Sequence, residues 1–405
     1  MTDEPSDEQQ LQREVAALVS APAPTILALT STMNSLSKHN SDYTTSVVRN
    51  ARYFVALAWL LLGQQKRCDA QLKALSMSFR LNAACFLPRR NAELPPLDGP
   101  LSHVWSRDTV LSEDLLATLR HGFREDSRFW TEHGYREPGC PFFSYLYPLD
   151  EPPRNAIEEA IQAIHRITMR EAPDAPKALS CEWWAHRRSQ GARWLAGAHP
   201  LHFDTDERTF GSTRLLHPAS SCILYLEGEL GPTLITDKTP QTPGLGNRGL
   251  LAWPRQNRVV SFPGNLLHGV LPAKANGQAV RVSLIMAWWG LPGAPRDDNV
   301  GKGPCQRCPK QGWPSEFRLT GNEEGQTSCE TPQEKRRKTE PMPPQGPGVS
   351  LVEPLWESIE LPAKTQLVDQ SVEAEGTVPL RFFVAHAKAF EELYAESERA
   401  LAGDR

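Results

Sequence analysis

The pattern of apolar and polar positions divides the chain into a helical part followed by a part built of short strands. From about Thr44 to Leu87 the apolar residues recur at helical spacing, and the Pro-rich stretch from Leu94 to Pro100 ends that unit. Between about Leu179 and Gly290 short β-branched and aromatic runs alternate with Gly, Pro and Asn. The strands predicted there are Ile223–Leu226, Thr233–Thr236, Leu250–Trp253, Val259–Phe262, Leu266–Val270 and Val280–Trp289. Such a series is typical of a sandwich or barrel, and we expect a jelly roll of two facing sheets.

Two helices are predicted to support these strands, because their start signals are clear. Ser112 precedes two acidic residues and an apolar run, and Asn155 is followed three residues later by Glu158. The second helix is amphipathic, so its apolar face should lie on a sheet.

The longest apolar run, Tyr53–Gly63, is about half the roughly 20 residues that cross a bilayer, and it predicts a buried helix without a membrane span.

The ends of the chain are polar. Residues 1–42 predict a weakly ordered N-terminus with one helix near Glu8–Val19, and Pro, Gly, Glu and Lys dominate about Asn322 to Val349, as in a flexible linker. An extended strand is predicted at Leu351–Ala363 and a helix at Pro379–Leu401. The predicted organisation is an N-terminus at 1–42, a helical module at 43–100, a jelly-roll domain with supporting helices at 101–320, a linker at 321–350 and a C-terminal extended segment and helix at 351–405.

Charge and cysteine content narrow the partners and the compartment. With 44 basic and 48 acidic residues the net charge is -4, so no nucleic-acid partner is expected. Eight cysteines are too few for a disulfide scaffold, and the acidic start Met1–Glu8 is no secretory leader, which favours the cytoplasm. Lys335–Lys338 resembles a short nuclear-import signal, although such a run in a solvated segment more often has no role. The oligomeric state is left open.

His202 and Asp204 are the first candidates for chemistry. Of the eleven histidines only His202 is followed at the second position by an acidic residue. On a strand, residues two apart share a face, so both side chains can reach one ion while Phe203 packs on the other side. A single His-x-Asp is weak support for a metal site, because polar pairs are common at strand ends.

Three later residues complete the pattern. His268 lies in the apolar segment Phe262–Gly269, and Arg281 lies in the apolar strand Ala279–Met286. A buried guanidinium needs an anion, which is either a nearby carboxylate of the chain or a ligand. Ser283 shares the face of Arg281 and offers a hydroxyl to the same anion. Two imidazoles and one carboxylate form the facial triad that leaves positions open on non-haem Fe(II).

The set resembles the Fe(II)- and 2-oxoglutarate-dependent oxygenase superfamily, whose pattern is His-x-Asp, a distal His and an Arg at least ten residues beyond it, often as Arg-x-Ser. The resemblance covers about Glu182 to Gly290. It implies a double-stranded β-helix in which His202, Asp204 and His268 bind iron and Arg281 with Ser283 holds the far carboxylate of 2-oxoglutarate.

The activity that this resemblance implies is a dioxygenase. It would use O2, with ascorbate as a candidate reductant, and would oxidise a small-molecule or protein substrate, most simply by hydroxylation, with release of succinate and CO2. The distal Arg281 is unlike the prolyl-hydroxylase branch, which usually has Lys, and Asp204 is the residue that halogenases of the family lack. The alternative is a catalytically inactive jelly-roll binding module that retains the metal site. The substrate stays open.

Several neighbouring residues are candidates with a structural alternative. Tyr225 is placed where an aromatic hydroxyl could touch 2-oxoglutarate, and Thr233 is a weaker case, but a core tyrosine is the more common situation. A substrate channel is one interpretation of a group of aromatic and basic residues that equally fits a core: Trp183, Trp184, His186–Arg188, Trp288 and Trp289.

The remaining polar candidates are weaker. Asp206 and Glu207 are expected to support the metal ligands rather than bind metal, and His199 and His217 are given no role. Cys305 and Cys308 have the spacing of half a zinc site, but no second pair follows, so unpaired thiols in a loop are expected.

Overall fold

The computed structural model describes the central part of the chain, with gaps. The described residues are 52, 55–56, 59–75, 77, 79–86, 96–135, 142–172, 177–189, 199–206, 209, 215–228, 230–242, 246–271, 279–290, 305–319 and 348–359. The expectations for residues 1–42, for the basic run Lys335–Lys338 and for the helix Pro379–Leu401 lie outside them, as does Glu207.

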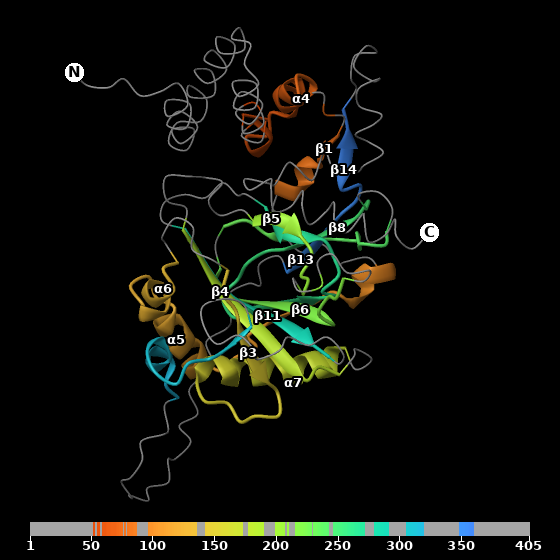
Figure 1. Cartoon of the computed structure of the whole chain (residues 1–405). Helices are drawn as coiled ribbons and strands as arrows, with labels where there is room; N and C mark the ends of the chain where they lie inside the picture. Colours follow the sequence, from red (N-terminus) through yellow and green to blue (C-terminus); the bar gives the residue numbers. More distant parts are fainter. Residues whose placement is uncertain are drawn as a thin grey trace, which may run out of the picture.

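Two antiparallel sheets form the centre of the described molecule (Figure 1). The seven-stranded sheet has the order β12 (Gln306–Arg307), β3 (Tyr145–Pro148), β4 (Ser180–Ser189), β11 (Val280–Trp289), β6 (Ser220–Gly228), β9 (Arg258–Phe262) and β2 (Trp105–Asp108). Only its edge pair β12–β3 is parallel. The five-stranded sheet has the order β13 (Val349–Val352), β8 (Gly249–Ala252), β7 (Thr233–Thr236), β10 (His268–Val270) and β5 (His199–His202). The prediction of a mostly β core is confirmed.

The long strands of the seven-stranded sheet separate an apolar face from a mixed face by simple alternation. On β4, for example, Cys181, Trp183 and Ala185 belong to a core cluster that also contains the buried residues of the helices. The intervening residues Trp184, His186 and Arg188 instead line a cavity between the sheets. A one-residue slip would exchange these two sets, so the apolar pattern fixes which side chains reach the cavity.

The helices cover the apolar face of this sheet. They are α5 (Glu113–Gly122), α6 (Arg128–Glu132) and α7 (Ala156–Glu171). The side chain of Asn155 accepts from two backbone N–H groups of the first turn of α7, and Ile157, Ile161 and Ile164 are fully buried against the strands. Both predicted helix starts are therefore confirmed, since Ser112 caps α5.

The five-stranded sheet packs on its far side against the N-terminal residues. One core cluster joins Leu72 of α4 (Gln65–Lys73) with Leu234 and Leu251 of the sheet and Leu355 near the C-terminal end of the described residues. A two-stranded sheet links β1 (Phe79–Leu81) to β14 (Trp356–Ser358), and these elements lie beyond the five-stranded sheet, away from α7 (Figure 1). Within the described residues three short 3-10 helices connect the rest, namely η1 (Ala83–Phe86), η2 (Gly99–His103) and η5 (Trp313–Phe317).

In the apolar run Tyr53–Gly63 the described residues Val55, Ala56, Trp59 and Leu60 are at most 5% exposed, whereas Leu61 and Leu62 are partly buried and Gly63 is exposed. Within the described residues no helix is both long and apolar enough to cross a membrane. The six strands predicted between Ile223 and Trp289 are all present, whereas β4 was not among them because its second half, His186–Ser189, is polar.

Candidate metal centre

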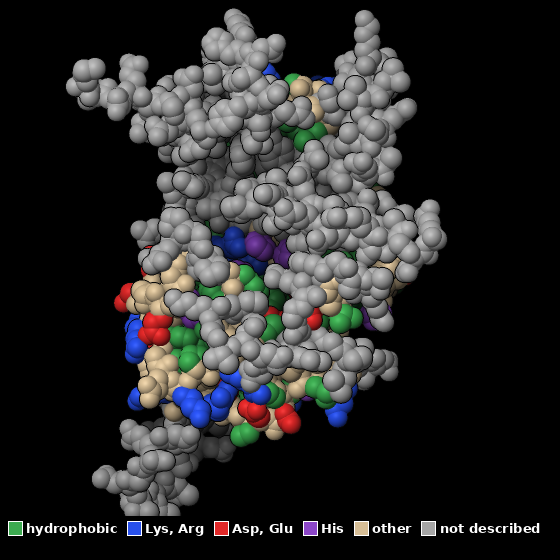
Figure 2. Space-filling model, in the orientation of Figure 1, with side chains coloured by type: hydrophobic (Ala, Val, Ile, Leu, Met, Phe, Trp, Pro, Cys, Tyr) green, Lys and Arg blue, Asp and Glu red, His purple; other side chains and the backbone are tan. Residues whose placement is uncertain are grey.

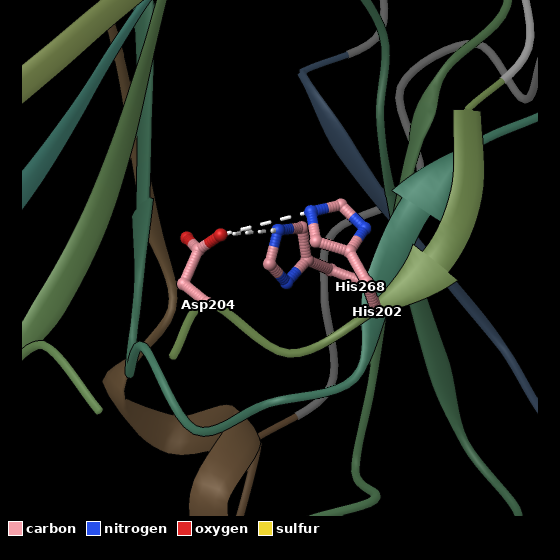
Figure 3. A group of neighbouring side chains, drawn as sticks. All are labelled: His202, Asp204 and His268. Carbon is pink, nitrogen blue, oxygen red and sulfur yellow. Dashed lines mark ion pairs between the residues drawn. The ribbon is translucent and has the colours of Figure 1, made fainter. Parts of the chain in front are cut away.

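His202, Asp204 and His268 come together at one end of the cavity between the two sheets. Their ligand atoms all lie within 4.8 Å of one another. The Nε2 atoms of His202 and His268 are 3.6 and 3.7 Å from the same carboxylate oxygen, Asp204 Oδ1. Figure 3 shows both imidazoles directed at that oxygen from the side of β5 and β10. The predicted convergence of the three residues is thus present in the structure.

The sheet register places the two imidazoles side by side. β5 and β10 are antiparallel, and His202 is the direct cross-strand partner of His268. Side chains at such a position project from the same face of the sheet, and here the two ring centroids are 4.4 Å apart. Neighbouring strands therefore supply two of the three groups without any help from loops.

Asp204 reaches the site in a different way from the one expected. β5 ends at His202, so Asp204 lies two residues beyond the strand and not on it. The carboxylate is 8% exposed and is held by β6, because the hydroxyl of Ser221 donates to Asp204 Oδ2 at 2.5 Å. His217 Nδ1 donates to the backbone carbonyl of Asp204 at 2.7 Å. Phe203 packs into the N-terminal core cluster, as expected.

The ring of His268 is oriented so that its Nε2 faces the carboxylate of Asp204. Its Nδ1 lies 2.9 Å from the carbonyl oxygen of Leu266, which can only accept, so Nδ1 carries a proton, and Nε2 is the ring nitrogen that faces Asp204 Oδ1. Imidazoles that bind metals characteristically donate their other N–H to a carbonyl or carboxylate in this way. A divalent cation between the two Nε2 atoms and Oδ1 therefore fits the donor set.

A cavity extends from these residues between the sheets. Its floor is formed by β4 and β11, and its opposite side by β5, β7 and β10. In the space-filling view histidine atoms lie directly beside Lys or Arg atoms at the middle of the molecule (Figure 2). The described lining residues are Trp184, His186, Arg188, His199, His202, Asp204, Ile223, Thr233, His268, Gly269, Val270, Arg281, Ser283 and Ile285.

Arg281 lines the same cavity and is 3% exposed. Its guanidinium donates to the carbonyl of Gly231 and to Thr233 Oγ1, both at 2.9 Å, and to Ser283 Oγ at 3.2 Å. All three acceptors are neutral, and no carboxylate of the described residues forms an ion pair with Arg281. Burial lowers its pKa, yet a guanidinium stays charged at neutral pH. The alternative that Arg281 forms an ion pair with a carboxylate of the chain is therefore not observed among the described residues.

Thr233 and Tyr225 hold this guanidinium in place. The Tyr225 hydroxyl is 2.8 Å from Thr233 Oγ1, and its ring lies under the guanidinium with the Arg281 Cζ 4.9 Å from the ring centroid. Leu230, with a φ of 75°, occupies the left-handed region at the turn that presents the Gly231 carbonyl. Tyr225 is fully buried and is not among the described residues that line the cavity, while Thr233 is.

The other polar lining residues come from β4 and β5. His199 Nδ1 is 2.9 Å from Arg188 Nη2, and His186 Nδ1 is 3.0 Å from the hydroxyl of Tyr135. Burial, together with nearby positive charge, lowers the pKa of His199 and of His186 well below that of a free imidazole. Both rings are therefore neutral at neutral pH. His199 was given no role from sequence, and its exposure to the cavity follows only from the pairing of β5 with β10.

The aromatic candidates divide between the cavity and the core. Trp184 lines the cavity, whereas Trp183 and Trp288 are at most 1% exposed in the cluster beneath the helices. Trp289 is also buried and donates to Glu182 Oε2 at 3.2 Å. Only Trp184 of this group is therefore placed to meet a ligand of the cavity.

The weaker metal candidates stay apart from the centre. Within the described residues the triad is the only group of three or more His, Cys, Asp or Glu side chains that could hold a metal ion, so neither Asp206 nor Cys305 or Cys308 joins one. Cys305 donates to Glu182 Oε1 at 3.1 Å, and burial raises the pKa of Cys308 to about 12. Cys308 is a free thiol, as expected.

No protein-family model matches the sequence, and no curated protein does. Solved structures with some similarity include a prolyl-4-hydroxylase from Pseudomonas putida, with 16% identity over 46% of this chain and 87% of that one and a TM-score of 0.30. HygX from Streptomyces hygroscopicus with nickel and 2-oxoglutarate bound has 12% identity over 53% and 94% and a TM-score of 0.27. SnoK, a non-heme alpha ketoglutarate dependent carbocyclase from nogalamycin biosynthesis, has 12% identity over 46% and 79% and a TM-score of 0.29.

All three solved structures have a low sequence identity to this chain. The functional conclusion therefore rests on the residues that line the cavity.

Proposed function

We propose that the chain is a Fe(II)- and 2-oxoglutarate-dependent dioxygenase that oxidises, most simply by hydroxylation, a substrate bound in the cavity between the sheets. The observation that carries this proposal is the pairing of two groups in one cavity. His202, Asp204 and His268 offer three ligand atoms within 4.8 Å, and Arg281 presents a buried guanidinium whose acceptors among the described residues are all neutral.

The donor set suits iron. Two imidazoles and one carboxylate oxygen leave the remaining positions of a six-coordinate ion open for a chelating keto acid and for O2. When bound, iron and 2-oxoglutarate supply the oxidation: substrate, O2 and 2-oxoglutarate give hydroxylated substrate, succinate and CO2. The described residues need only hold and orient the reactants, and none of them has to act as the oxidant.

Arg281 fits the second carboxylate of 2-oxoglutarate. A guanidinium forms two parallel hydrogen bonds to a carboxylate, which Lys does not reproduce. The Tyr225 ring and the Thr233 hydroxyl fix its orientation, and Ser283 adds a hydroxyl beside it. In this proposal Tyr225 acts through Arg281 and Thr233, not by direct contact with 2-oxoglutarate.

Succinate formation from 2-oxoglutarate by purified protein with Fe(II) and ascorbate tests the proposal. The wild type should form succinate, and His202→Ala and Arg281→Ala should reduce it at least about 100-fold, because each removes a group that binds a reactant. Arg187→Ala is a matched control, because the Arg187 side chain projects from the opposite face of β4. There its Nη1 lies 3.8 Å from Glu227 Oε2. A wild type that binds metal but forms no succinate with broad substrate pools would instead support a binding module that has lost turnover.

A further inference from the structure

Two contacts between the sheets define two sides of the cavity. On one side the Tyr225 hydroxyl of β6 lies 2.8 Å from Thr233 Oγ1 of β7. On the other side Arg188 Nη2 of β4 lies 2.9 Å from His199 Nδ1 of β5. In the seven-stranded sheet β11 lies between β4 and β6. A ligand in front of β4 therefore meets different side chains from a ligand in front of β6.

The guanidinium of Arg281 is directed to the side of β6 and β7. It donates to the carbonyl of Gly231, just before β7, and to Thr233 Oγ1 on β7. The ring of Tyr225 on β6 lies under it, with the Arg281 Cζ 4.9 Å from the ring centroid. The carboxylate of 2-oxoglutarate that the proposed function assigns to Arg281 would thus lie toward β6 and β7. The substrate would then occupy the part of the cavity in front of β4.

Trp184 brings an indole to the floor in front of β4. It lines the cavity and is half-buried, whereas its neighbours Trp183 and Ala185 are buried in the core. Ile285 of β11 is the direct register partner of Trp184, and Ile223 of β6 pairs with Ile285 from the other side. Because Ile223 and Ile285 also line the cavity, an apolar band crosses its floor.

The apolar band lies close to the metal triad. Ser221 precedes Ile223 by two residues on β6 and shares its face, and the Ser221 hydroxyl donates to Asp204 Oδ2 at 2.5 Å. From the opposite sheet His268 and Val270, two residues apart on β10, both line the cavity. A substrate group beside the metal in front of β4 therefore contacts mostly apolar side chains. Such surroundings suit a hydrocarbon group, since a charged group would lose its hydration there.

Phe142 extends this aromatic surface away from the cavity. The ring centroids of Phe142 and Trp184 are 5.7 Å apart and their planes meet at 76°, which is the edge-to-face arrangement that aromatic pairs favour. Phe142 is 45% exposed and is one of the two large apolar side chains classed as exposed among the described residues. Aromatic rings thus extend from the molecular surface to the cavity on the side of β4.

We propose that the substrate carries an aromatic ring that packs on the indole of Trp184, so that C–H bonds of the ring or its substituent lie beside the metal. A flat indole favours a planar ring over an aliphatic one, because aromatic pairs attract each other beyond what their buried area provides. This inference rests on the proposed function, which assigns 2-oxoglutarate to Arg281. Trp184 is accordingly a specificity residue of the same site.

A matched pair of neutral probes tests the inference: 3-phenylpropanamide and 3-cyclohexylpropanamide. The two compounds share the side chain and the amide, and the cyclohexyl compound is the more hydrophobic, so a site that selects for apolar area alone would favour it. Calorimetry measures both affinities on the full chain loaded with Mn(II) and 2-oxoglutarate. The wild type should bind the phenyl compound at least about 3-fold more tightly than the cyclohexyl compound.

Substitutions of Trp184 test whether the indole causes this preference. Trp184→Leu keeps an apolar side chain and should reduce the preference to less than about 1.5-fold, whereas Trp184→Phe should retain part of it. Trp105→Leu is the matched control, because Trp105 is half-buried on the edge strand β2 of the same sheet and is not among the described residues that line the cavity. It should leave the preference unchanged. All three variants should bind 2-oxoglutarate within about 3-fold of the wild type, which shows that the site is folded.

The peptide acetyl-Gly-Phe-Gly-amide distinguishes two sources of the ring. Tighter binding of this peptide than of 3-phenylpropanamide identifies the ring as a side chain of a protein substrate, and weaker binding identifies a small molecule. Both results support an aromatic substrate.

Equal affinities of the two amide probes for the wild type, a preference for the cyclohexyl compound, or no binding of the phenyl compound would overturn the inference. An undiminished preference in Trp184→Leu would also overturn it. Failure of the proposed function is a distinct result, because a wild type that does not bind 2-oxoglutarate in the presence of Mn(II) would refute that proposal itself. A wild type that binds 2-oxoglutarate but shows no preference for the phenyl compound refutes only the inference.

Discussion

Ser221 provides a sharp test of the metal centre, because its hydroxyl touches only the outer oxygen of the carboxylate. It donates to Asp204 Oδ2 at 2.5 Å, and both residues are buried, at 0% and 8% exposed. Ser221→Ala removes that donor and leaves Oδ1, which faces His202 and His268, in place. The variant should therefore weaken the metal site without deleting a ligand.

The expected size follows from the type of bond. A hydrogen bond to a charged group contributes roughly 1.5 to 3 kcal/mol, and loss of a group that orients a metal ligand typically costs about 10- to 100-fold in metal affinity. The dissociation constant for Mn(II) should thus rise about 10- to 100-fold in Ser221→Ala. The metal-free variant should also melt at a lower temperature than the metal-free wild type, because Asp204 Oδ2 stays buried without the Ser221 donor.

Calorimetric titration with Mn(II) measures this change, and Ser180→Ala serves as its control. The Ser180 hydroxyl is also buried in the seven-stranded sheet, at 7% exposed for the residue, but has no hydrogen-bond partner among the described residues. Its removal should leave the Mn(II) affinity unchanged. An affinity of Ser221→Ala within about 2-fold of the wild type would refute the assignment of Asp204 as a metal ligand held by Ser221.

Three further predictions concern the anion site, pH and the core. Thr233→Val removes the acceptor of an Arg281 hydrogen bond of 2.9 Å. Calorimetry should show a several-fold lower affinity for 2-oxoglutarate and an unchanged affinity for Mn(II). Burial lowers the pKa of His165, so the unfolded chain takes up its proton first and stability falls as pH drops below the ordinary value of 6.5. His165→Phe should lessen that fall in urea denaturation, and an undiminished fall contradicts the assignment. Leu355→Ala, at a fully buried position, should cost about 2 to 5 kcal/mol in the same assay, whereas a negligible cost would show that this segment does not stabilise the core.

The strands around the site could be predicted because their alternation is strong. Val280–Trp289 was predicted with the bounds that the structure shows, and its alternate positions carry Arg281 and Ser283 to the cavity. The triad and Arg281 could be named from residue type and spacing alone. Their convergence could not be proved that way, because it depends on β5 pairing with β10 across many intervening residues.

Residues that support the site left little trace in the sequence. Ser221 and His217 contact Asp204 only because the chain beyond β5 folds back toward β6. β4 was missed as a strand for a related reason, since its polar residues face a cavity and break the apolar pattern expected of a buried strand. In both cases the missing information is tertiary, and a local pattern does not contain it.

Equilibrium binding of 2-oxoglutarate to the wild type, with and without Mn(II), tests the central claim most directly. If the triad and Arg281 form one site, binding should be tight with metal and at least about 10-fold weaker without it, because the keto acid loses its chelating contact. His268→Ala should abolish the metal effect, since it removes one of the three ligands. Binding that is absent in both conditions, or equal in both, would contradict the account.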